Sequence, residues 1–353
     1  MTNQNPTGAK KSKTGLIAVL ISLLALGVVG TVGFSSITNF ISRFQIEDYQ
    51  GEPGPVTQIV IEPGDTGEDV ARKLLNADVV KSFDAIYREM LNSDFSEIYP
   101  GTYEFPTKIS GAQALRLLIS GDNKVVLSVT IPEGYRNAQV IEKLSSELNL
   151  AKADLEAAIE AAKSSIPEDA VNLEGYLYPA TYEFDPGVSA TQVIERMVTR
   201  TEQELAKYDL TLADSFDVIR TASVIQLEAM HEEDFYKVSR VIQNRLELGM
   251  LLQMDSTVNY GTNGTKITTT DAQRADPNLY NTYVHKGLPV GPIGNPGATA
   301  IEAALRPADG KWLYFVTVNL KTGETVFSET YAQHEVAAQQ FYKWLRENPD
   351  WND

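Results

Sequence analysis

The sequence predicts an α+β protein with a single N-terminal transmembrane helix, a small α+β domain and a larger α+β domain. Three observations lead to this prediction. One uncharged apolar run near the N-terminus is long enough to cross a bilayer. Beyond it, short strand-like alternations are interspersed with amphipathic helical patterns. The 353 residues, 43% of them hydrophobic, suffice for two domains that each have a core.

The apolar run occupies residues 15–34 and reads GLIAVLISLLALGVVGTVGF. Three lysines and no acid precede it, so the positive-inside rule places the N-terminus in the cytoplasm and the remaining chain outside. A cleaved signal peptide is the alternative, but its apolar region is usually only about 7–15 residues long. We therefore expect a cytoplasmic tail over residues 1–13, a transmembrane helix over 14–36 and a single-pass protein of the cell membrane.

The charge and the cysteine count exclude several classes of function. The net charge is −17 and, because the three N-terminal lysines contribute +3, the rest of the chain carries −20. Such an acidic body argues against nucleic acid as a partner, since phosphate binding requires clustered Lys and Arg. No cysteine is present, and the sequence HEEDF at residues 231–235 lacks the second His of the HExxH zinc motif. We predict neither a metal nor a cofactor.

A linker is predicted over residues 37–55, and a small α+β domain over residues 56–123. The predicted elements of this domain are a strand over 57–61, helices over 68–75 and 83–91, a strand over 101–105 and a helix over 111–118. The turn Pro63-Gly64-Asp65-Thr66 precedes the first helix, and its Asp or Thr can cap that helix. This start resembles a LysM module, a small fold that binds glycans containing N-acetylglucosamine. A domain that serves only for packing is the alternative.

The larger domain is predicted over residues 124–353. Its expected elements are a strand over 124–131, helices over 137–148, 152–162, 190–208, 218–229 and 232–248, and a hairpin of strands over 312–318 and 325–327. Four aromatic rings stand in the segment LEGYLYPATYEF at residues 173–184. They either line a surface on which sugars stack or pack the strand and loop. Glu174 in this segment is a candidate substrate-binding acid.

Glu228 is the predicted catalytic residue. In a helix it stands over Val224 and Ile225, at the edge of an apolar stripe. Apolar neighbours destabilise the charged form of an acid and raise its pKa, which a general acid that works near neutral pH requires. Periodicity alone allows an exposed surface glutamate equally well. The acids at 232–234 are explained without a site, because acids are favoured in the first turn of a helix.

Two further segments supply groups suited to a sugar site. The polar stretch LLQMDSTVNYG at 251–261 offers amide, carboxylate, hydroxyl and phenol groups, and the Pro- and Gly-rich stretch 287–297 predicts a rigid wall. Together with LEGYLYPATY, ASVIQLEA, VIQNRLELG, YNTYVHKGLPVGPIGNPG and the YFV strand, they resemble the YceG-like, or MltG, family of endolytic murein transglycosylases. The resemblance runs in the same order from about Ile59 to Tyr342.

This resemblance implies that Glu228 acts as both acid and base. Family members often carry a second Glu two residues earlier, where this chain has Gln226, and Val290 replaces the second Pro of the family's GLPPGPI loop. The implied reaction cleaves the β-1,4 bond between N-acetylmuramic acid and N-acetylglucosamine in nascent glycan strands. The sugar's own 6-hydroxyl attacks and leaves a 1,6-anhydro end. A single carboxylate suffices, because no second one is needed to activate water.

The predicted partners are peptidoglycan strands, the membrane through the one helix, and cell-wall synthases. The candidate substrate-binding residues are Asn244, Gln253, Asp255, Thr257, Tyr260 and Glu174. Two alternatives remain open. One is a hydrolytic muramidase in which Asp255 is the second carboxylate, and the other is a non-catalytic glycan-binding scaffold of cell-wall synthesis.

Overall fold

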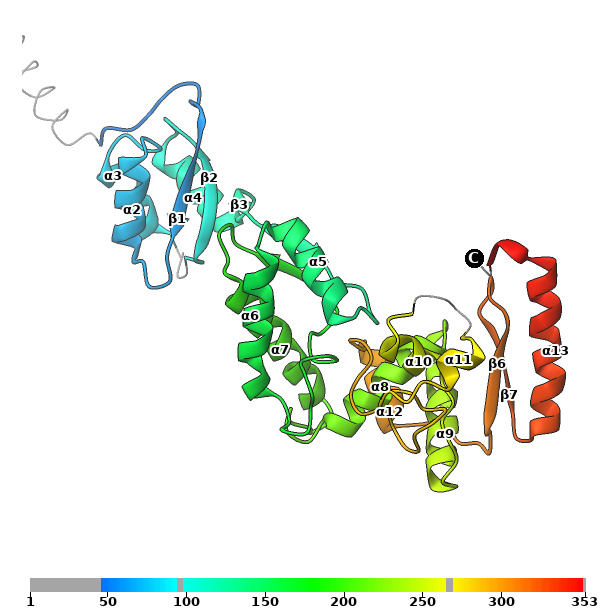
Figure 1. Ribbon diagram of the computed structural model, residues 1–353. Helices are drawn as coiled ribbons and strands as arrows, with labels where there is room; N and C mark the ends of the chain where they lie inside the picture. The colour runs from blue at the N-terminus through cyan, green and yellow to red at the C-terminus, as the bar shows by residue number, and fades with distance from the viewer. Residues whose placement is uncertain (1–45, 94–97, 265–268, 352–353) are drawn as a thin grey trace, which may run out of the picture. The chain divides into compact units, whose positions relative to one another are not determined.

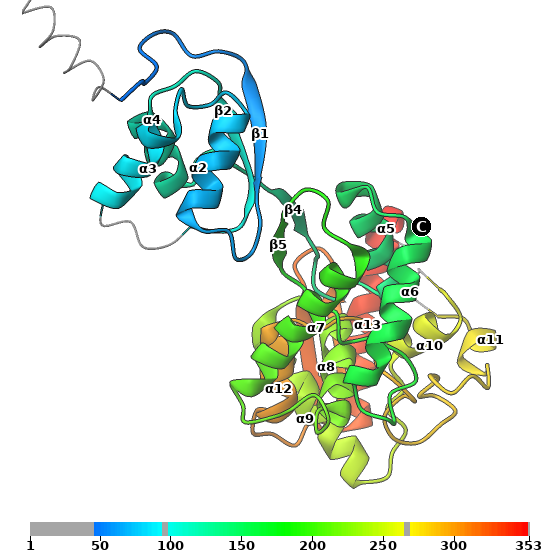
Figure 2. The ribbon, with the colours of Figure 1, turned by 90° about the vertical axis from the view of Figure 1, so that its left-hand side faces the viewer.

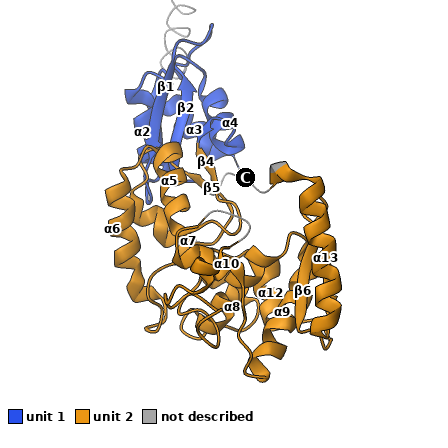
Figure 3. Cartoon of the chain, turned by 45° about the vertical axis from the view of Figure 1, so that its right-hand side comes forward, with its two compact units in different colours: residues 1–125 blue, residues 126–353 orange. Residues whose placement is uncertain are grey.

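A computed structural model describes residues 46–93, 98–264 and 269–351 and divides the chain into two compact units, residues 1–125 and 126–353 (Figure 3). The predicted tail and transmembrane helix, over residues 1–36, lie outside the described residues. Within the three described ranges, no helix has the length and apolar character needed to cross a membrane.

The described part of unit 1, residues 46–93 and 98–125, contains a three-stranded antiparallel sheet and three helices (Figure 1). Its elements are β1 (Val56–Ile61), α2 (Gly67–Asn76), α3 (Phe83–Asn92), β2 (Gly101–Pro106), α4 (Gly111–Ser120) and β3 (Lys124–Val125). The central strand β2 pairs with β1 along its whole length, from Val56 opposite Pro106 to Ile61 opposite Gly101. The helices close a core of their own, in which Leu74, Ile86 and Phe105 are completely buried.

The start of α2 follows from the turn before it. The Thr66 side chain accepts a hydrogen bond from the Asp69 backbone N–H, and the Asp69 carboxylate accepts one from the Thr66 N–H. This reciprocal pair satisfies two N–H groups that a helix start otherwise leaves unpaired. The predicted cap is confirmed, with Thr66 as the N-cap residue.

The single strand predicted over residues 124–131 is two strands. Residues Lys124–Val125 form β3 of the first sheet, whereas β4 (Leu127–Thr130) pairs with β5 (Thr181–Phe184) in a different sheet. The alternation of apolar residues continues through Val126, so periodicity gives no sign of the break. The two units therefore join within this apolar segment.

Unit 2 begins with the β4–β5 pair and three helices that pack with it (Figure 2). These helices are α5 (Asn137–Leu148), α6 (Lys152–Ala162) and α7 (Ala190–Ala206), and the short 3-10 turn η1 (Lys163–Ser165) follows α6. Antiparallel pairing sets Leu127 opposite Phe184 and Thr130 opposite Thr181. The loop between η1 and β5 contains the segment LEGYLYP, whose Leu173 and Tyr176 are completely buried.

The second half of unit 2 is built around two consecutive helices and ends in a hairpin covered by one long helix (Figure 1). Its elements are α8 (Phe216–Glu228), α9 (Glu232–Glu247), α10 (Asp255–Gly261), α11 (Asp271–Arg274), α12 (Ala298–Leu305), β6 (Tyr314–Asn319), β7 (Glu324–Ser328), α13 (Tyr331–Glu347) and η2 (Pro349–Trp351). The hairpin pairs Tyr314 with Ser328 and carries an irregularity at Thr317–Asn319.

Helix α8 is the central element of this half. Four consecutive residues, Ala222 to Ile225, are buried, so the helix is covered on all sides in its middle. Helices α9, α10 and α12 all pack against it. A helix that is apolar on one face only would have one side in water, so this burial marks α8 as part of the core.

Candidate active site

Glu228 is the last residue of α8. The buried middle of the helix precedes it, and Ala229 leaves the helical path with extended backbone angles. The carboxyl therefore lies where the core helix reaches the edge of the packed interior, and the residue is partly buried. The sequence pattern predicts this apolar support, but it places Glu228 inside the helix rather than at its end.

Ser256 binds the Glu228 carboxyl. Its hydroxyl donates to Oε1 of Glu228 at 2.5 Å, and its backbone N–H points at the same oxygen from 3.4 Å. Ser256 is the second residue of α10, and this short helix packs against α8 (Figure 1). The contact fixes the orientation of one carboxyl oxygen and leaves Oε2 without a hydrogen bond from the described residues.

Burial raises the pKa of Glu228 from its ordinary value to about 7. The two hydrogen bonds from Ser256 and the positive charge of Arg245 act in the opposite direction, and the negative charge of Asp255 adds to the rise. An acid with this pKa is half protonated at neutral pH, and it can both give and take a proton there. This is the direction that the apolar neighbours of Glu228 predict.

The other carboxylate near Glu228, that of Asp255, is held by its own set of donors. Oδ1 accepts from the Tyr283 hydroxyl at 2.6 Å and from the Thr269 hydroxyl at 2.8 Å, and Arg274 lies 3.7 Å from the same oxygen. The Thr269 N–H approaches Oδ2 at 3.4 Å. These contacts fix the orientation of the Asp255 carboxyl.

Glu174 and Tyr260 form a second acidic cluster at the other end of α10. Tyr260 lies four residues after Ser256, and its hydroxyl donates to Oε2 of Glu174 at 3.0 Å. The first N–H of α5, from Asn137, donates to Oε1 at 3.0 Å. Burial raises the pKa of Glu174 to about 7, against the effect of these two bonds. Arg136 lies over the Tyr260 ring at 5.0 Å.

One short helix thus holds both perturbed acids, each through a hydroxyl. Residues four apart lie on the same face of a helix, and Ser256 and Tyr260 use this spacing to reach Glu228 and Glu174. The polar composition of residues 251–261 predicts a loop rather than a helix, so this relation could not be predicted. Ser256 is missed there for the same reason.

The remaining predicted site residues hold loops in place. The Asn244 amide donates to the carbonyl oxygens of Gly310 and Trp312 at 3.2 and 2.8 Å. Thr257 is completely buried and bonds to Met254 and Thr282. Gln253 is exposed, with a positive φ of 50°.

The Pro- and Gly-rich segment 287–297 is attached to α8 and to two other loops. Ser223 accepts from the Ile293 N–H at 3.1 Å, and Gln226 accepts from the Gly297 N–H at 2.9 Å. Asn295, which is fully buried, accepts from the Leu177 N–H at 2.8 Å and donates to the Tyr135 carbonyl at 2.8 Å. The segment forms no helix, as expected, and these bonds hold it in place, whereas its role as a wall of the site stays a prediction. Gln226 has a structural contact here.

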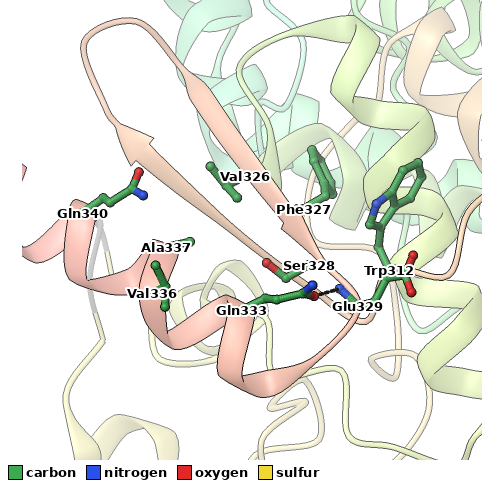
Figure 4. Close-up of a pocket in the computed structure, with 9 residues that line it drawn as sticks. All are labelled: Trp312, Val326, Phe327, Ser328, Glu329, Gln333, Val336, Ala337 and Gln340. Carbon is green, nitrogen blue, oxygen red and sulfur yellow. Dashed lines mark hydrogen bonds between the residues drawn. The ribbon is translucent and has the colours of Figure 1, made fainter.

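A groove of about 460 Å³ lies elsewhere in unit 2, between β7 and α13 (Figure 4). Its lining includes Trp312, Phe327, Val336 and Gln340, and the Glu329 N–H donates to the Gln333 side chain at one end. None of its lining residues belongs to the two acidic clusters on α10.

The chain is similar to several known proteins. The YceG-like family matches residues 59–340. The endolytic murein transglycosylase of Bacillus subtilis (strain 168) is 30% identical over 319 residues, which cover 84% of this chain and 88% of that protein. The protein of the same description from Streptococcus pneumoniae (strain D39) is 26% identical over 92% of this chain. This chain spans 64% of the length of the pneumococcal protein.

A solved structure is also similar. The crystal structure of a YceG-like protein from Listeria monocytogenes has 30% sequence identity and a TM-score of 0.52, and the match covers 80% of this chain and 99% of that one.

Proposed function

The chain belongs to the YceG-like family, and we propose that it is an endolytic lytic transglycosylase that cleaves peptidoglycan strands at Glu228. The observation that carries this proposal is a partly buried carboxyl with a pKa of about 7 and one oxygen fixed by Ser256. The relatives whose matches cover 84% and 92% of this chain are named endolytic murein transglycosylases.

The proposed reaction uses one carboxyl twice. Protonated Glu228 gives its proton to the oxygen between N-acetylmuramic acid and N-acetylglucosamine, and the bond from that oxygen to C1 breaks. The 6-hydroxyl oxygen of the same muramic acid then bonds to C1, and its proton passes to the Glu228 carboxylate. The products are a free 4-hydroxyl and a 1,6-anhydro end, no water is consumed, and the acid is restored.

The hydrogen bonds of Asp255 support a one-carboxyl reaction over hydrolysis. A hydrolytic muramidase needs a second carboxylate as base or nucleophile. Oδ1 of Asp255 accepts hydrogen bonds from the Thr269 and Tyr283 hydroxyls, and the positively charged Arg274 lies 3.7 Å from the same oxygen. The donors around Oδ1 compete with any water that Asp255 would have to activate.

The location of the enzyme is proposed from its sequence. The apolar run at residues 15–34 supports a single N-terminal anchor, with the tail in the cytoplasm and the catalytic unit outside. The β1–α2–α3–β2 order of unit 1 and its capped PGDT turn support the LysM-like assignment. Such an enzyme acts on strands close to the membrane, where cell-wall synthases are its expected neighbours.

Product analysis of Glu228→Gln tests the proposal. With purified peptidoglycan, the wild-type protein should release fragments with 1,6-anhydro ends, whereas the variant should lose at least about a hundredfold of this activity because general acid catalysis is gone. Glu233→Gln, on the exposed first turn of α9, is the matched control and should keep full activity.

Mass spectrometry separates the alternatives. Fragments that carry an added water identify a hydrolase, and anhydro ends identify a transglycosylase. Binding of glycan without any release, unchanged by Glu228→Gln, would identify a scaffold. Retention of anhydro-end release by Glu228→Gln would refute the assignment of the acid.

A further inference from the structure

Glu174 is a buried acid that the proposed reaction does not use. Only 4% of its surface is exposed, and each oxygen of its carboxyl accepts a hydrogen bond. Oε2 accepts from the Tyr260 hydroxyl near the end of α10, and Oε1 accepts from the Asn137 N–H at the start of α5, both at 3.0 Å. The sequence favours Glu174 as a substrate-binding acid, but this burial and these bonds favour a role inside the protein.

The segment that carries Glu174 is packed tightly against α8. Gly175 has a positive φ of 87°, and a Cβ at this position would lie 2.6 Å from the Ile219 side chain of α8 and 2.7 Å from that of Pro292. The Glu174 N–H also donates to Oδ1 of Asn172 at 2.9 Å. Such close packing leaves the segment little freedom, so Glu174 is anchored to the helix that ends in Glu228.

Helix α10 connects this anchor to the candidate acid. Ser256, near the start of the helix, donates to Oε1 of Glu228 at 2.5 Å, and Tyr260, one turn later, donates to Glu174. Because the segment of Glu174 packs against α8, these contacts form a closed ring that starts and ends on that helix.

Helix α10 depends on such contacts because it is short. It has seven residues, and an isolated helix of that length is not stable in water. Thr257 holds its first turn through a 2.9 Å bond to Thr282 in the loop after α11. The bond from Tyr260 to Glu174 holds its other end, so the direction of the Ser256 hydroxyl depends on both.

We propose that Glu174 is a positioning residue, which through Tyr260 and α10 holds the Ser256 hydroxyl on the Glu228 carboxyl. The proposal rests on the proposed function, because that function assigns the acid that is affected. Without the bond from Tyr260 to Glu174, the end of α10 loses its anchor and the Ser256 hydroxyl spends less time on Oε1 of Glu228. A carboxylate that loses a donor is less stable, so Glu228 then keeps its proton to higher pH.

Charged and titratable groups face the two acids from several elements, and they decide which substitutions are informative. The groups that interact with Glu174 or Glu228 are Arg136, Tyr260, Tyr280, Asp255, Arg245 and Tyr283. Tyr260→Phe removes no charge at neutral pH, because burial raises the pKa of the Tyr260 phenol. Loss of the Glu174 charge by itself would lower the proton affinity of Glu228, which is opposite to the direction proposed.

The experiment follows the carboxyl titration of Glu228 by NMR in full-length protein labelled with ¹³C-glutamate. Glu228→Gln identifies its resonance and Glu174→Gln that of Glu174, so the two titrations are separated. Tyr260→Phe is the main variant, because it removes one hydroxyl and keeps the ring. Tyr236→Phe is the matched control, since the Tyr236 hydroxyl also donates to a glutamate, Glu302 at 3.2 Å, and joins α9 to α12, two helices that pack against α8.

Tyr260→Phe should raise the titration midpoint of Glu228 by about 0.3–0.5 unit, and Tyr236→Phe should leave it unchanged. Ser256→Ala should raise it by about half a unit to one unit. When Tyr260→Phe is added to Ser256→Ala, no further shift is expected, because the hydroxyl through which Tyr260 acts is already absent. Glu174→Gln, whose amide has one acceptor oxygen in place of two, should also raise the midpoint.

An unchanged midpoint in Tyr260→Phe would overturn the proposal, since the contact would then be purely structural. An equal shift in the Ser256→Ala background would exclude Ser256 as the intermediate, and a lower midpoint in Glu174→Gln would show a direct effect of charge. A raised KM for glycan with an unchanged midpoint would assign Glu174 to substrate binding. If Glu174→Gln does not fold, Tyr260→Phe decides.

This titration uses the resting protein and needs no turnover. If Glu228→Gln keeps its activity, the assignment of the acid fails, while the effect of Tyr260 and Glu174 on Glu228 is still measured. The two failures are therefore distinguishable.

Discussion

At the scale of single residues, the proton affinity of Glu228 is a balance between burial and three neighbours. Burial and Asp255 raise the pKa, and Ser256 and Arg245 lower it, with a result of about 7. The sequence predicts the raised pKa, because the apolar residues before Glu228 are visible in it. It does not predict Ser256 or Arg245, since their effect depends on segments that meet only in the folded chain.

This balance makes activity depend on pH in a defined direction. The proposed acid must be protonated to act, so kcat should fall about tenfold per pH unit above its pKa of about 7. Ser256→Ala removes a donor that favours the ionised form, so the decline should move to higher pH by about half a unit to one unit, with a lower maximum. A pH profile of kcat measures both.

The control for this change is Ser239→Ala. Ser239 is a buried serine on α9 whose hydroxyl has no hydrogen-bond partner in the described part of the chain. Removal of the Ser239 hydroxyl should therefore leave the pH profile of kcat unchanged. A profile of Ser256→Ala that coincides with wild type, or moves to lower pH, would contradict the role given to the Ser256 hydroxyl.

At the scale of elements, the long helices follow from the sequence and the short one does not. Residues 137–148 and 152–162 are helices over the predicted ranges, because each has apolar residues at helical spacing that are buried on one face. Helix α10 has seven residues, rich in Ser, Thr and Asn, and such a segment forms a helix only through tertiary contacts. The four-residue spacing through which Ser256 and Tyr260 reach Glu228 and Glu174 lies within this helix.

The segment 287–297 beside the candidate site is held in place by one buried side-chain amide, that of Asn295. Asn295 joins the segment 287–297 to Leu177 and Tyr135, and it also donates to Asn137 at 3.0 Å. Asn295→Ala leaves the buried Leu177 N–H without its partner and removes the side-chain bonds to Tyr135 and Asn137, so it should lower the free energy of unfolding of unit 2 by about 2–3 kcal/mol. Urea unfolding measures this loss.

Asn348→Ala is the matched control for Asn295. The Asn348 amide makes one bond, to the Trp344 carbonyl at the end of α13. Its removal should lower the free energy of unfolding by less than about 1 kcal/mol. Equal losses in the two variants would show that Asn295 is not a junction of the three loops.

At the scale of the whole molecule, the chain has two separate cores. Each core cluster draws its residues from one unit alone. The family resemblance read from the sequence covers both, and the family match to residues 59–340 bears it out. The sequence could not show which loops of unit 2 meet, because residues such as Glu174 and Tyr260 are 86 positions apart in the chain.

Separate cores predict separate unfolding. Leu74 of α2 is completely buried in the core of unit 1, so Leu74→Ala should lower the stability of that unit by about 2–5 kcal/mol. All three tryptophans, Trp312, Trp344 and Trp351, belong to unit 2. In the full-length protein, the transition followed by tryptophan fluorescence should therefore stay in place, while the transition seen by far-UV circular dichroism gains an earlier phase.

Leu91→Ala is the control, since Leu91 is 66% exposed and its loss should change stability by less than about 0.5 kcal/mol. A shift of the fluorescence midpoint with Leu74→Ala would mean that the two cores unfold as one.

Because Glu228 is the last residue of α8, the direction of that helix also affects the proton affinity of its carboxyl. The aligned peptide dipoles of a helix leave a partial negative charge at its C-terminal end, where the last carbonyl groups have no partner. A carboxylate at that end is repelled, whereas the same group in the first turn would be stabilised. Because α8 runs toward the site and stops at Glu228, the backbone itself favours the protonated acid.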